Sequence, residues 1–276
     1  MGTFLGHITP GIFFCVWSLW DLIGLFSDYF SAAQRKQTAP WMSATYYNMG
    51  PTACRRLNIE SFIKILFPLF GIISMACVNG LAVVGNEQHM TMYFFFGLHG
   101  ITELMHIYGF PLAKSLHLPH VSLALAYFME GLLFFFHLHG KDMMEVHVHV
   151  LLVYVIYGTT LATALEIKFR SSLLLAVLRS AGTFLQGLWF WAVAFILYNP
   201  IPNAVKWDPT SHADNMLVTA TFCWTVAATY IGVVLVATIT YYCVRKCTTG
   251  NSKDEVYEAV PMSDSMEFIN LTPDED

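Results

Sequence analysis

Long runs of apolar residues, separated by shorter polar segments, organise this chain. A helix rises about 1.5 Å per residue and therefore needs about 20 apolar residues to cross the hydrocarbon core of a bilayer. The runs do not alternate between apolar and polar positions, as the strands of a membrane β-barrel do. The pattern thus predicts seven transmembrane helices, over residues 8–28, 60–84, 90–110, 121–139, 148–168, 173–198 and 216–244.

The polar segments between these runs are too short to bury cores of their own, so we expect one membrane domain over residues 1–247. Prolines and asparagines punctuate the segments, as at 199–203. From Asp254 to Asp276 the chain carries acidic side chains and no basic one. The predicted architecture is an all-α, seven-helix bundle followed by an acidic, disordered tail over residues 248–276.

The composition agrees with a membrane protein. Of the 276 residues, 56% are hydrophobic and 12% are charged, whereas soluble domains carry about 25% charged residues. The net charge of −5 comes from the tail and indicates no charged partner. The chain has no basic patch that would bind nucleic acid. The expected partner of the apolar surface is therefore the lipid bilayer.

Basic residues segregate to one side of the predicted bundle. If the chain crosses seven times, the side opposite the N-terminus receives Arg35, Lys36, Arg55, Arg56, Lys114, Lys168, Arg170, Arg245, Lys246 and Lys253. The other side receives only Lys141 and Lys206. Because cytosolic loops are enriched in Lys and Arg, we expect an exoplasmic N-terminus and a cytosolic C-terminus.

Two short signals lie near the predicted cytosolic end of the chain. Cys243 and Cys247 flank a basic pair where the last helix leaves the membrane, a setting typical of palmitoylation. Tyr257 and Val260 have the spacing of a tyrosine-based sorting signal, which adaptor proteins would read. These signals favour the plasma membrane or a membrane of the endosomal and secretory pathway.

Polar side chains within the predicted helices are costly in lipid, so they are expected to face the bundle interior. They include Glu103, Glu130, Glu166, Arg179 and Gln186. Glu166 and Arg179 both lie toward the cytosolic half and are expected to form an ion pair.

Further polar positions fall on the first three predicted helices. Asp21 could pair in a similar way with Glu60 and Lys64, between the first and second helices. His99, Glu103 and His106 share one helix face at spacing i, i+4, i+7, as a hydrogen-bonded stripe or as part of a metal site.

Histidines concentrate near the predicted exoplasmic side. His137 and His139 end the fourth helix and His147 and His149 begin the fifth, with Asp142 and Glu145 in the loop between them. His7 and His89 belong at the same depth. In a helix, residues i and i+2 point apart, so the sequence favours His139 and His149 as the inward pair. The layer predicts a zinc or other transition-metal ion on ligands drawn from His7, His89, His137, His139, His149 and Glu145.

Three classes of function follow from this layer. The first is a metal-dependent membrane enzyme in which the metal activates water. The second is transport of protons or metal ions, with Glu103, Glu130 and Glu166 forming a path with the histidines. The third is a non-catalytic scaffold or receptor-like protein in which the polar layer is structural. Besides a bound metal, the histidine layer could be a hydrogen-bonded polar layer, or could sense pH or handle protons.

Several stretches resemble the transmembrane protein 45 family. They are Gly6-His7, His89–Gly97, Glu130-Gly131, His137 with His139, Arg179-Ser180, Gln186-Gly187, Trp207-Asp208 and Phe222–Trp224. The opening and the overall length are similar to its transmembrane epididymal branch. The resemblance implies a seven-span membrane protein and supplies no established activity or catalytic residue.

The chain also departs from that family at several positions. Thr225 and Ala192 stand where relatives place His and Gln, and Glu145 replaces a more usual Asp. His99 and His106 do not match family positions. A family site that used the first two side chains would be lost in this chain.

Overall fold

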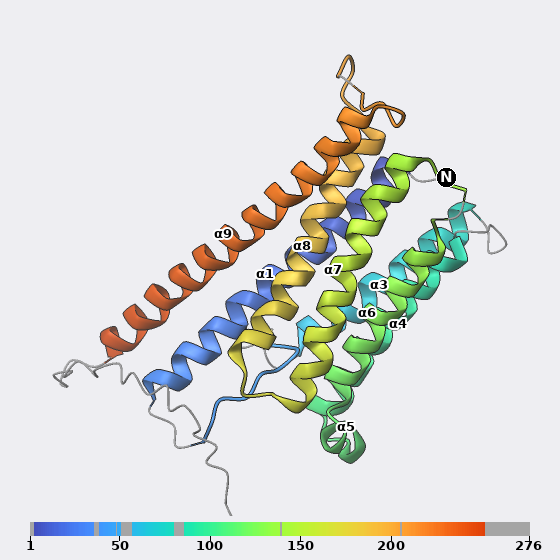
Figure 1. Cartoon of the computed structure of the whole chain (residues 1–276). Helices are drawn as coiled ribbons and strands as arrows, with labels where there is room; N and C mark the ends of the chain where they lie inside the picture. Colours follow the sequence, from blue (N-terminus) through green and yellow to red (C-terminus); the bar gives the residue numbers. More distant parts are fainter. Residues whose placement is uncertain are drawn as a thin grey trace, which may run out of the picture.

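The fold is known from a computed structural model, which describes residues 3–35, 39–47, 49–50, 57–79, 86–138, 140–204 and 206–251. All secondary structure in these ranges is helical (Figure 1). The helices are α1 (Phe4–Gln34), α3 (Ile59–Asn79), α4 (Asn86–Ile107), α5 (Pro111–Ser115), α6 (Leu118–Phe136), α7 (Met143–Lys168), α8 (Leu173–Tyr198) and α9 (His212–Asn251).

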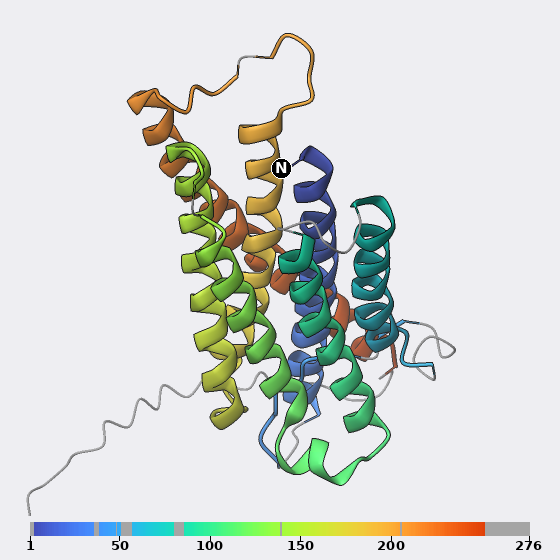
Figure 2. The same cartoon turned by 90° about the vertical axis from the view of Figure 1, so that its right-hand side faces the viewer.

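The long helices run side by side and form one bundle (Figures 1 and 2). We call the end where α1 begins the upper end, and it also carries the α6–α7 and α8–α9 connections. The lower end carries α5 and the start of α8. Helix α1 packs along α8, α3 along α4, and α6 along α7, while α9 lies across the outside of α1 and α8.

Short polar side chains begin several of the helices. Thr3 Oγ1 accepts a hydrogen bond from Gly6 N at 3.0 Å, at the start of α1. Asp142 Oδ1 accepts from Glu145 N at 2.7 Å, at the start of α7. These side chains satisfy backbone donors that have no partner within the first helical turn.

The described helices match the predicted spans in order and type, and differ at their ends. Helix α9 is longer than the span predicted at 216–244 and continues to Asn251. Residues 248–251, assigned to the tail, are therefore helical. Helix α6 ends at Phe136, so His137 and Leu138 lie in a turn beyond it. The short helix α5, which follows Phe110, was not predicted.

Six of the described helices are long and apolar enough to cross a membrane: α1, α3, α6, α7, α8 and α9. The third predicted span, 90–110, corresponds to α4, which has 22 residues but carries more polar side chains. Its His99 and Glu103 are both fully buried. Six of the seven predicted spans therefore correspond to helices that are long and apolar enough to cross a membrane. The lower hydropathy of α4 comes from its polar first turn and from polar side chains that face the bundle interior.

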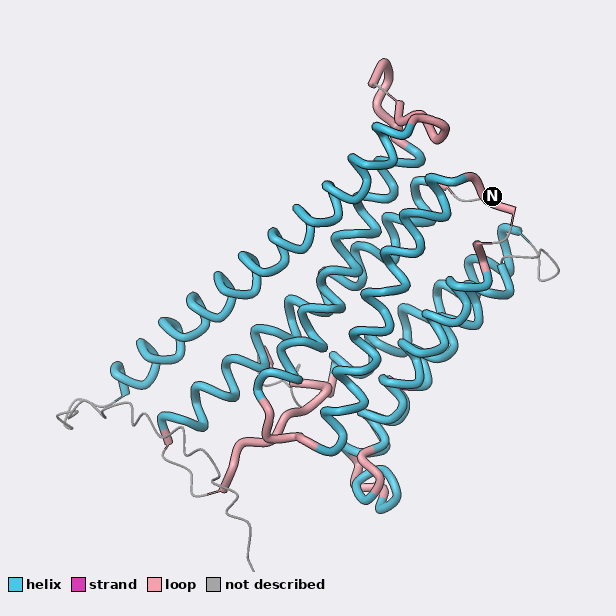
Figure 3. Tube along the Cα trace, viewed as in Figure 1, coloured by secondary structure: helices cyan, strands magenta, loops and turns pink. Residues whose placement is uncertain are grey.

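Residues 39–47, between α1 and α3, fold against the lower end of the bundle as an irregular segment (Figure 3). Ser43, Thr45 and Tyr47 are buried. Ser43 N donates to Arg170 O at 2.8 Å, which ties this segment to the α7–α8 turn. A loop at this depth must satisfy its backbone polar groups through the protein, and the partners of Ala44 and Thr45 are described below.

Candidate functional site

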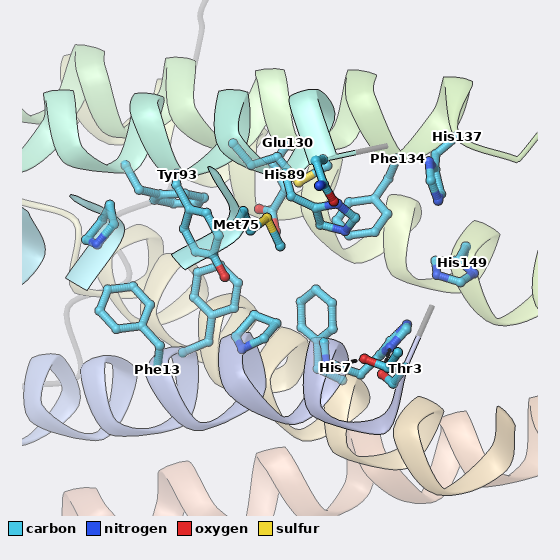
Figure 4. A pocket seen from close by; sticks show the side chains of 18 of the residues that line it. Thr3, His7, Phe13, Met75, His89, Tyr93, Glu130, Phe134, His137 and His149 are labelled. Carbon is cyan, nitrogen blue, oxygen red and sulfur yellow. Dashed lines mark hydrogen bonds between the residues drawn. The ribbon is translucent and has the colours of Figure 1, made fainter. Parts of the chain in front are cut away.

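A cavity of about 570 Å³ opens in the upper half of the bundle. Side chains from α1, α3, α4, α6, α7 and α8 surround it (Figure 4). Its polar lining residues are Thr3, His7, Asn86, His89, Tyr93, Glu130, His137, Lys141, Glu145 and His149. The volume is in the range of small-molecule sites, about 300–1,000 Å³.

Four of the predicted histidines line this cavity, as two ring pairs. The rings of His7 and His149 are 5.9 Å apart, and those of His89 and His137 are 6.0 Å apart. The histidines of α1, α4 and α7 and of the turn after α6 thus lie at one end of the bundle, as the sequence predicted. The fifth, His139, lies outside the described residues.

The hydrogen bonds of three of these rings leave the same nitrogen available. His7 Nδ1 donates to Thr3 O at 3.0 Å, and His149 Nδ1 donates to Glu145 O at 2.6 Å. His137 Nδ1 contacts Gln88 Oε1 at 2.5 Å. Because carbonyl oxygens only accept, a neutral ring in this arrangement keeps its Nε2 lone pair free for a ligand.

Charges at the cavity mouth are partly balanced. Lys141 Nζ donates to Glu145 Oε1 at 2.7 Å. Burial lowers the pKa of His137, and nearby His89 and Lys141 act in the same direction. His137 therefore favours its neutral form, which suits both hydrogen bonding and metal coordination.

Glu130 lies deeper on the cavity wall, on α6 (Figure 4). Its side chain is almost wholly buried, and within the described ranges its Oε2 atom has no hydrogen-bond partner. None of the ion pairs among the described residues includes it. A buried carboxylate without a partner is strongly disfavoured, so this position calls for a proton or for a cationic ligand.

Aromatic rings form the walls and floor around Glu130. Phe14 lies 5.4 Å from Phe96 and 6.0 Å from Phe190, measured between ring centroids. Phe134 lies 5.9 Å from Phe190. Phe14 and Phe96 also contact Trp17, whose ring centroid lies 5.9 Å from that of His99. The Phe94–Phe96 and Phe134–Phe136 runs each contribute one buried ring to the cavity.

The structure gives no positive support for a metal centre. Within the described ranges, no group of three or more His, Cys, Asp or Glu side chains is close enough together to hold a metal ion. The four cavity histidines form two pairs rather than one cluster. A site that also uses His139 stays a prediction.

Below the aromatic floor lies a buried group that we call the lysine group: Glu60, Lys64, His99 and Glu103. Lys64 Nζ donates to Glu60 Oε1 and to Glu103 Oε1, both at 2.8 Å. It also donates to Thr45 O at 2.8 Å. His99 Nε2 lies 3.0 Å from Glu103 Oε1. Lys64 is thus fully paired despite its burial, which is the condition under which such a charge is tolerated.

A second buried group, the arginine group, comprises Asp21, His120, Glu166 and Arg179. Arg179 Nε donates to Glu166 Oε2 at 2.8 Å, which confirms the predicted ion pair. Its other nitrogens donate to Asp21 Oδ2 at 2.6 Å and to Ala44 O at 2.9 Å. The expected link from Asp21 to Glu60 and Lys64 is wrong, because α1 turns Asp21 toward α8 instead.

The remaining predicted polar residues have separate partners. Gln186 is fully buried and its Nε2 donates to Thr159 Oγ1 at 3.2 Å. His106 does not join His99 and Glu103 in one polar stripe. Its Nδ1 lies 2.9 Å from Tyr46 Oη. Cys243 and Cys247 are exposed on α9. Tyr257 and Val260 lie outside the described residues.

Sequence reasoning missed the role of residues 43–47 and of His120. Nothing in a polar loop sequence indicates that the carbonyls of Ala44 and Thr45 will accept from buried cations. His120 follows a proline at the start of α6, and its Nε2 lies 3.5 Å from Glu166 Oε1. Its spacing of seven residues from Tyr127, and of ten from Glu130, was the available signal that it faces inward.

A family model described as a family of unknown function, DUF716, matches residues 117–240. This region belongs to the DUF716 family. The DUF716 region covers α6, α7, α8 and most of α9. It therefore contains His120, Glu166 and Arg179 of the arginine group, and Glu130 of the cavity.

The chain is also a distant homologue of transmembrane epididymal proteins, as the resemblance predicted. It is 24% identical to transmembrane epididymal protein 1A of Mus musculus over 243 residues, covering 81% of this chain and 76% of the relative. Identity to the Homo sapiens protein 1 is 27% over 179 residues, covering 63% and 65%. Identity to the Rattus norvegicus protein 1 is 24% over 272 residues, covering 89% and 84%.

Proposed function

We propose that this multi-pass membrane protein binds a small amphiphilic organic cation in its upper cavity. The observation that carries the proposal is Glu130, a buried carboxylate on the wall of a cavity lined by aromatic rings, with no partner among the described residues. Aromatic faces attract cations, most strongly when the site is desolvated. A carboxylate among such rings provides the complementary charge.

The rest of the lining supports a ligand of this class. Lys141 is paired with Glu145. With neutral histidines, Glu130 is therefore the unbalanced charge among the lining residues that the structure describes. Phe13, Phe67 and Tyr93 add aromatic surface on the side of α3 and α4. Apolar walls with few polar groups are typical of small-molecule sites. A receptor-like protein or a carrier could use such a site, and an enzyme would need further catalytic groups.

We place the upper end of the bundle on the exoplasmic side. Lys141 and Lys206 are carried by the upper connections, whereas Lys114, Arg170 and Arg245 lie toward the lower end. This distribution follows the positive-inside rule. The ligand would therefore enter from outside the cytosol, at the plasma membrane or within the endosomal and secretory pathway. Palmitoylation of Cys243 and Cys247, and adaptor binding through Tyr257 and Val260, remain part of this proposal.

Binding of tetraphenylphosphonium to the purified full chain in nanodiscs tests the proposal, with tetraphenylborate as the anion of matched shape. We expect saturable binding of the cation above empty nanodiscs, and weak binding of the anion. Glu130→Gln should lower affinity for the cation at least about 10-fold, or about 1.4 kcal/mol. The control is Glu87→Gln, an exposed carboxylate on α4 outside the cavity lining. Equal binding of both ions, or an unchanged affinity in Glu130→Gln, would contradict the proposal.

A second candidate is a zinc or other transition-metal ion at the cavity mouth. It is favoured by the free Nε2 positions of His7, His137 and His149 and by His139, two residues beyond His137. Elemental analysis of the detergent-purified protein tests it, beside the double variant His139→Ala/His149→Ala. Near-stoichiometric metal that disappears in the folded variant would support the candidate. A metal-free protein after purification in zinc-supplemented buffer would exclude it.

A further inference from the structure

The lysine group and the arginine group are built from the same parts, although they share no helix. Each has one cation, two carboxylates and one imidazole. In each, the imidazole faces the carboxylate that also pairs with the cation. Adjacent carbonyls complete both groups, since Lys64 donates to Thr45 O and Arg179 donates to Ala44 O.

Counting charges shows what both groups lack. With a neutral imidazole, each group holds two negative charges and one positive charge. Arg170 near His120 is not counted, because it is only partly buried, donates to Ser43 O and forms no ion pair among the described residues. The side chains are nearly inaccessible: the exposed fraction is 0% for Glu103 and for Glu166, and 3% for Lys64. An uncompensated charge is costly at this depth. One proton on each imidazole would bring each group to neutrality.

Hydrogen bonds around His99 place one proton on its Nδ1. Thr102 Oγ1 donates to His99 O at 2.8 Å and also contacts Ser122 Oγ at 2.6 Å. Ser122 Oγ lies 3.1 Å from Pro119 O and 3.2 Å from His99 Nδ1. The hydroxyl groups of Thr102 and Ser122 carry one proton each, which is too few for these four contacts. A ring protonated at Nδ1 serves the Ser122 contact. A second proton, at Nε2, would lie at the 3.0 Å contact with Glu103 Oε1, and the charge count calls for it.

The proton belongs on the ring rather than on Glu103. Glu103 Oε1 accepts from Lys64, and Glu103 Oε2 accepts from Ser61 Oγ at 2.9 Å. A carboxylate that accepts several donors is stabilised in its ionised form. The carboxylate oxygens that face Lys64 and Arg179 already accept hydrogen bonds of 2.6–2.8 Å from them. The space between each imidazole and its carboxylate therefore suits a proton rather than a metal cation.

We infer that each group binds one labile proton, carried as the imidazolium of His99 in the lysine group and of His120 in the arginine group. His99 faces Glu103 on its own helix, Lys64 from α3, Trp17 from α1 and Ser122 from α6. His120 faces Glu166 from α7, Arg179 from α8 and Arg170 from the α7–α8 turn. The bundle thus stores two protons beneath the cavity, and releasing them changes the charge of its core by two.

Nitrogen-15 NMR of the full chain in nanodiscs, with labelled histidine rings, tests this inference because it separates charged from neutral imidazoles. Spectra are recorded from pH 5 to 9 in choline, sodium and potassium buffers. His99→Gln and His120→Gln assign the two signals. We expect both rings to be charged at pH 7 in all three buffers and to become neutral as pH rises.

A matched pair of variants shows whether the charge count is the cause. Glu103→Gln removes one negative charge from the lysine group, so His99 should become neutral at pH 7 while His120 stays charged. Glu87→Gln, exposed on the same helix, should change neither ring. Two rings that stay neutral down to pH 5 in wild type would overturn the inference, and a sodium-dependent signal would replace the proton with a metal cation. None of the eight side chains lines the cavity, so the outcome is independent of ligand binding.

Discussion

Arg179 donates to acceptors from three separate parts of the chain: Asp21 on α1, Glu166 on α7 and Ala44 in the segment before α3. Only 2% of its side chain is exposed. A buried cation of this kind contributes little net stability when compared with a well-packed apolar replacement. Removing the cation alone is different, because two buried carboxylates then lose the cation that they share, and Asp21 keeps only the hydroxyl of Ser180 as a donor.

We therefore expect Arg179→Met to lower the free energy of unfolding by about 3–5 kcal/mol. The measurement is reversible denaturant unfolding in mixed micelles. Lys168→Met, at the exposed lower end of α7, is the control and should change stability by less than about 1 kcal/mol. Adding Asp21→Asn and Glu166→Gln to Arg179→Met should restore part of the loss. A loss in Arg179→Met no larger than in the control would show that the arginine group is not desolvated.

At the scale of elements, α1 and α8 approach closely at two glycines. A Cβ atom on Gly187 would lie 2.8 Å from Cys15 N, and one on Gly11 would lie 3.2 Å from Gly187 O. Both neighbours are backbone atoms, which cannot rotate away. Small residues permit such close packing between membrane helices. This contact also fixes Asp21 on α1 relative to Arg179 on α8.

Gly187→Ala should therefore push α1 and α8 apart and destabilise the bundle by about 1–3 kcal/mol. The control is Gly158→Ala on α7, where an added Cβ has no atom within 4 Å. Because alanine favours helix over glycine, this second change should be neutral or stabilise by up to about 1 kcal/mol. The measurement is the thermal unfolding of both variants and wild type in the same detergent. Equal effects at the two positions would mean that the helices are not in contact at Gly187.

At the scale of the whole molecule, orientation in the membrane determines which solution the cavity meets. In a cysteine-free background, Lys206→Cys places one thiol at the upper end and Lys114→Cys places one at the lower end. A membrane-impermeant thiol reagent applied to intact cells should modify only the first. Both should react after permeabilisation. Labelling of the lower thiol in intact cells would reverse the proposed orientation and put the cavity on the cytosolic side.

Much of the architecture could be predicted from residues whose role is local. The apolar runs correctly predicted the long helices, and the shared depth of Glu166 and Arg179 correctly predicted their ion pair. Asp21 was assigned to the wrong partner, because a residue's depth in the membrane does not tell which neighbouring helix it faces. For the site, the sequence predicted only which residues share a depth in the membrane. Four histidines do lie together at the upper end, as two pairs. The central position of Glu130 could not be predicted, because it depends on the aromatic walls that tertiary packing forms around it.

The sequence by itself determined the membrane class, the helices and the depth of each polar side chain, because hydropathy and rise per residue act along one dimension. Tertiary structure alone decided how those helices face one another. That choice opened a cavity beside Glu130, divided the buried charges into two matched groups and placed the carbonyls of Ala44 and Thr45 over both cations. The reason is physical: pairing and burial depend on packing across helices that are far apart in the chain.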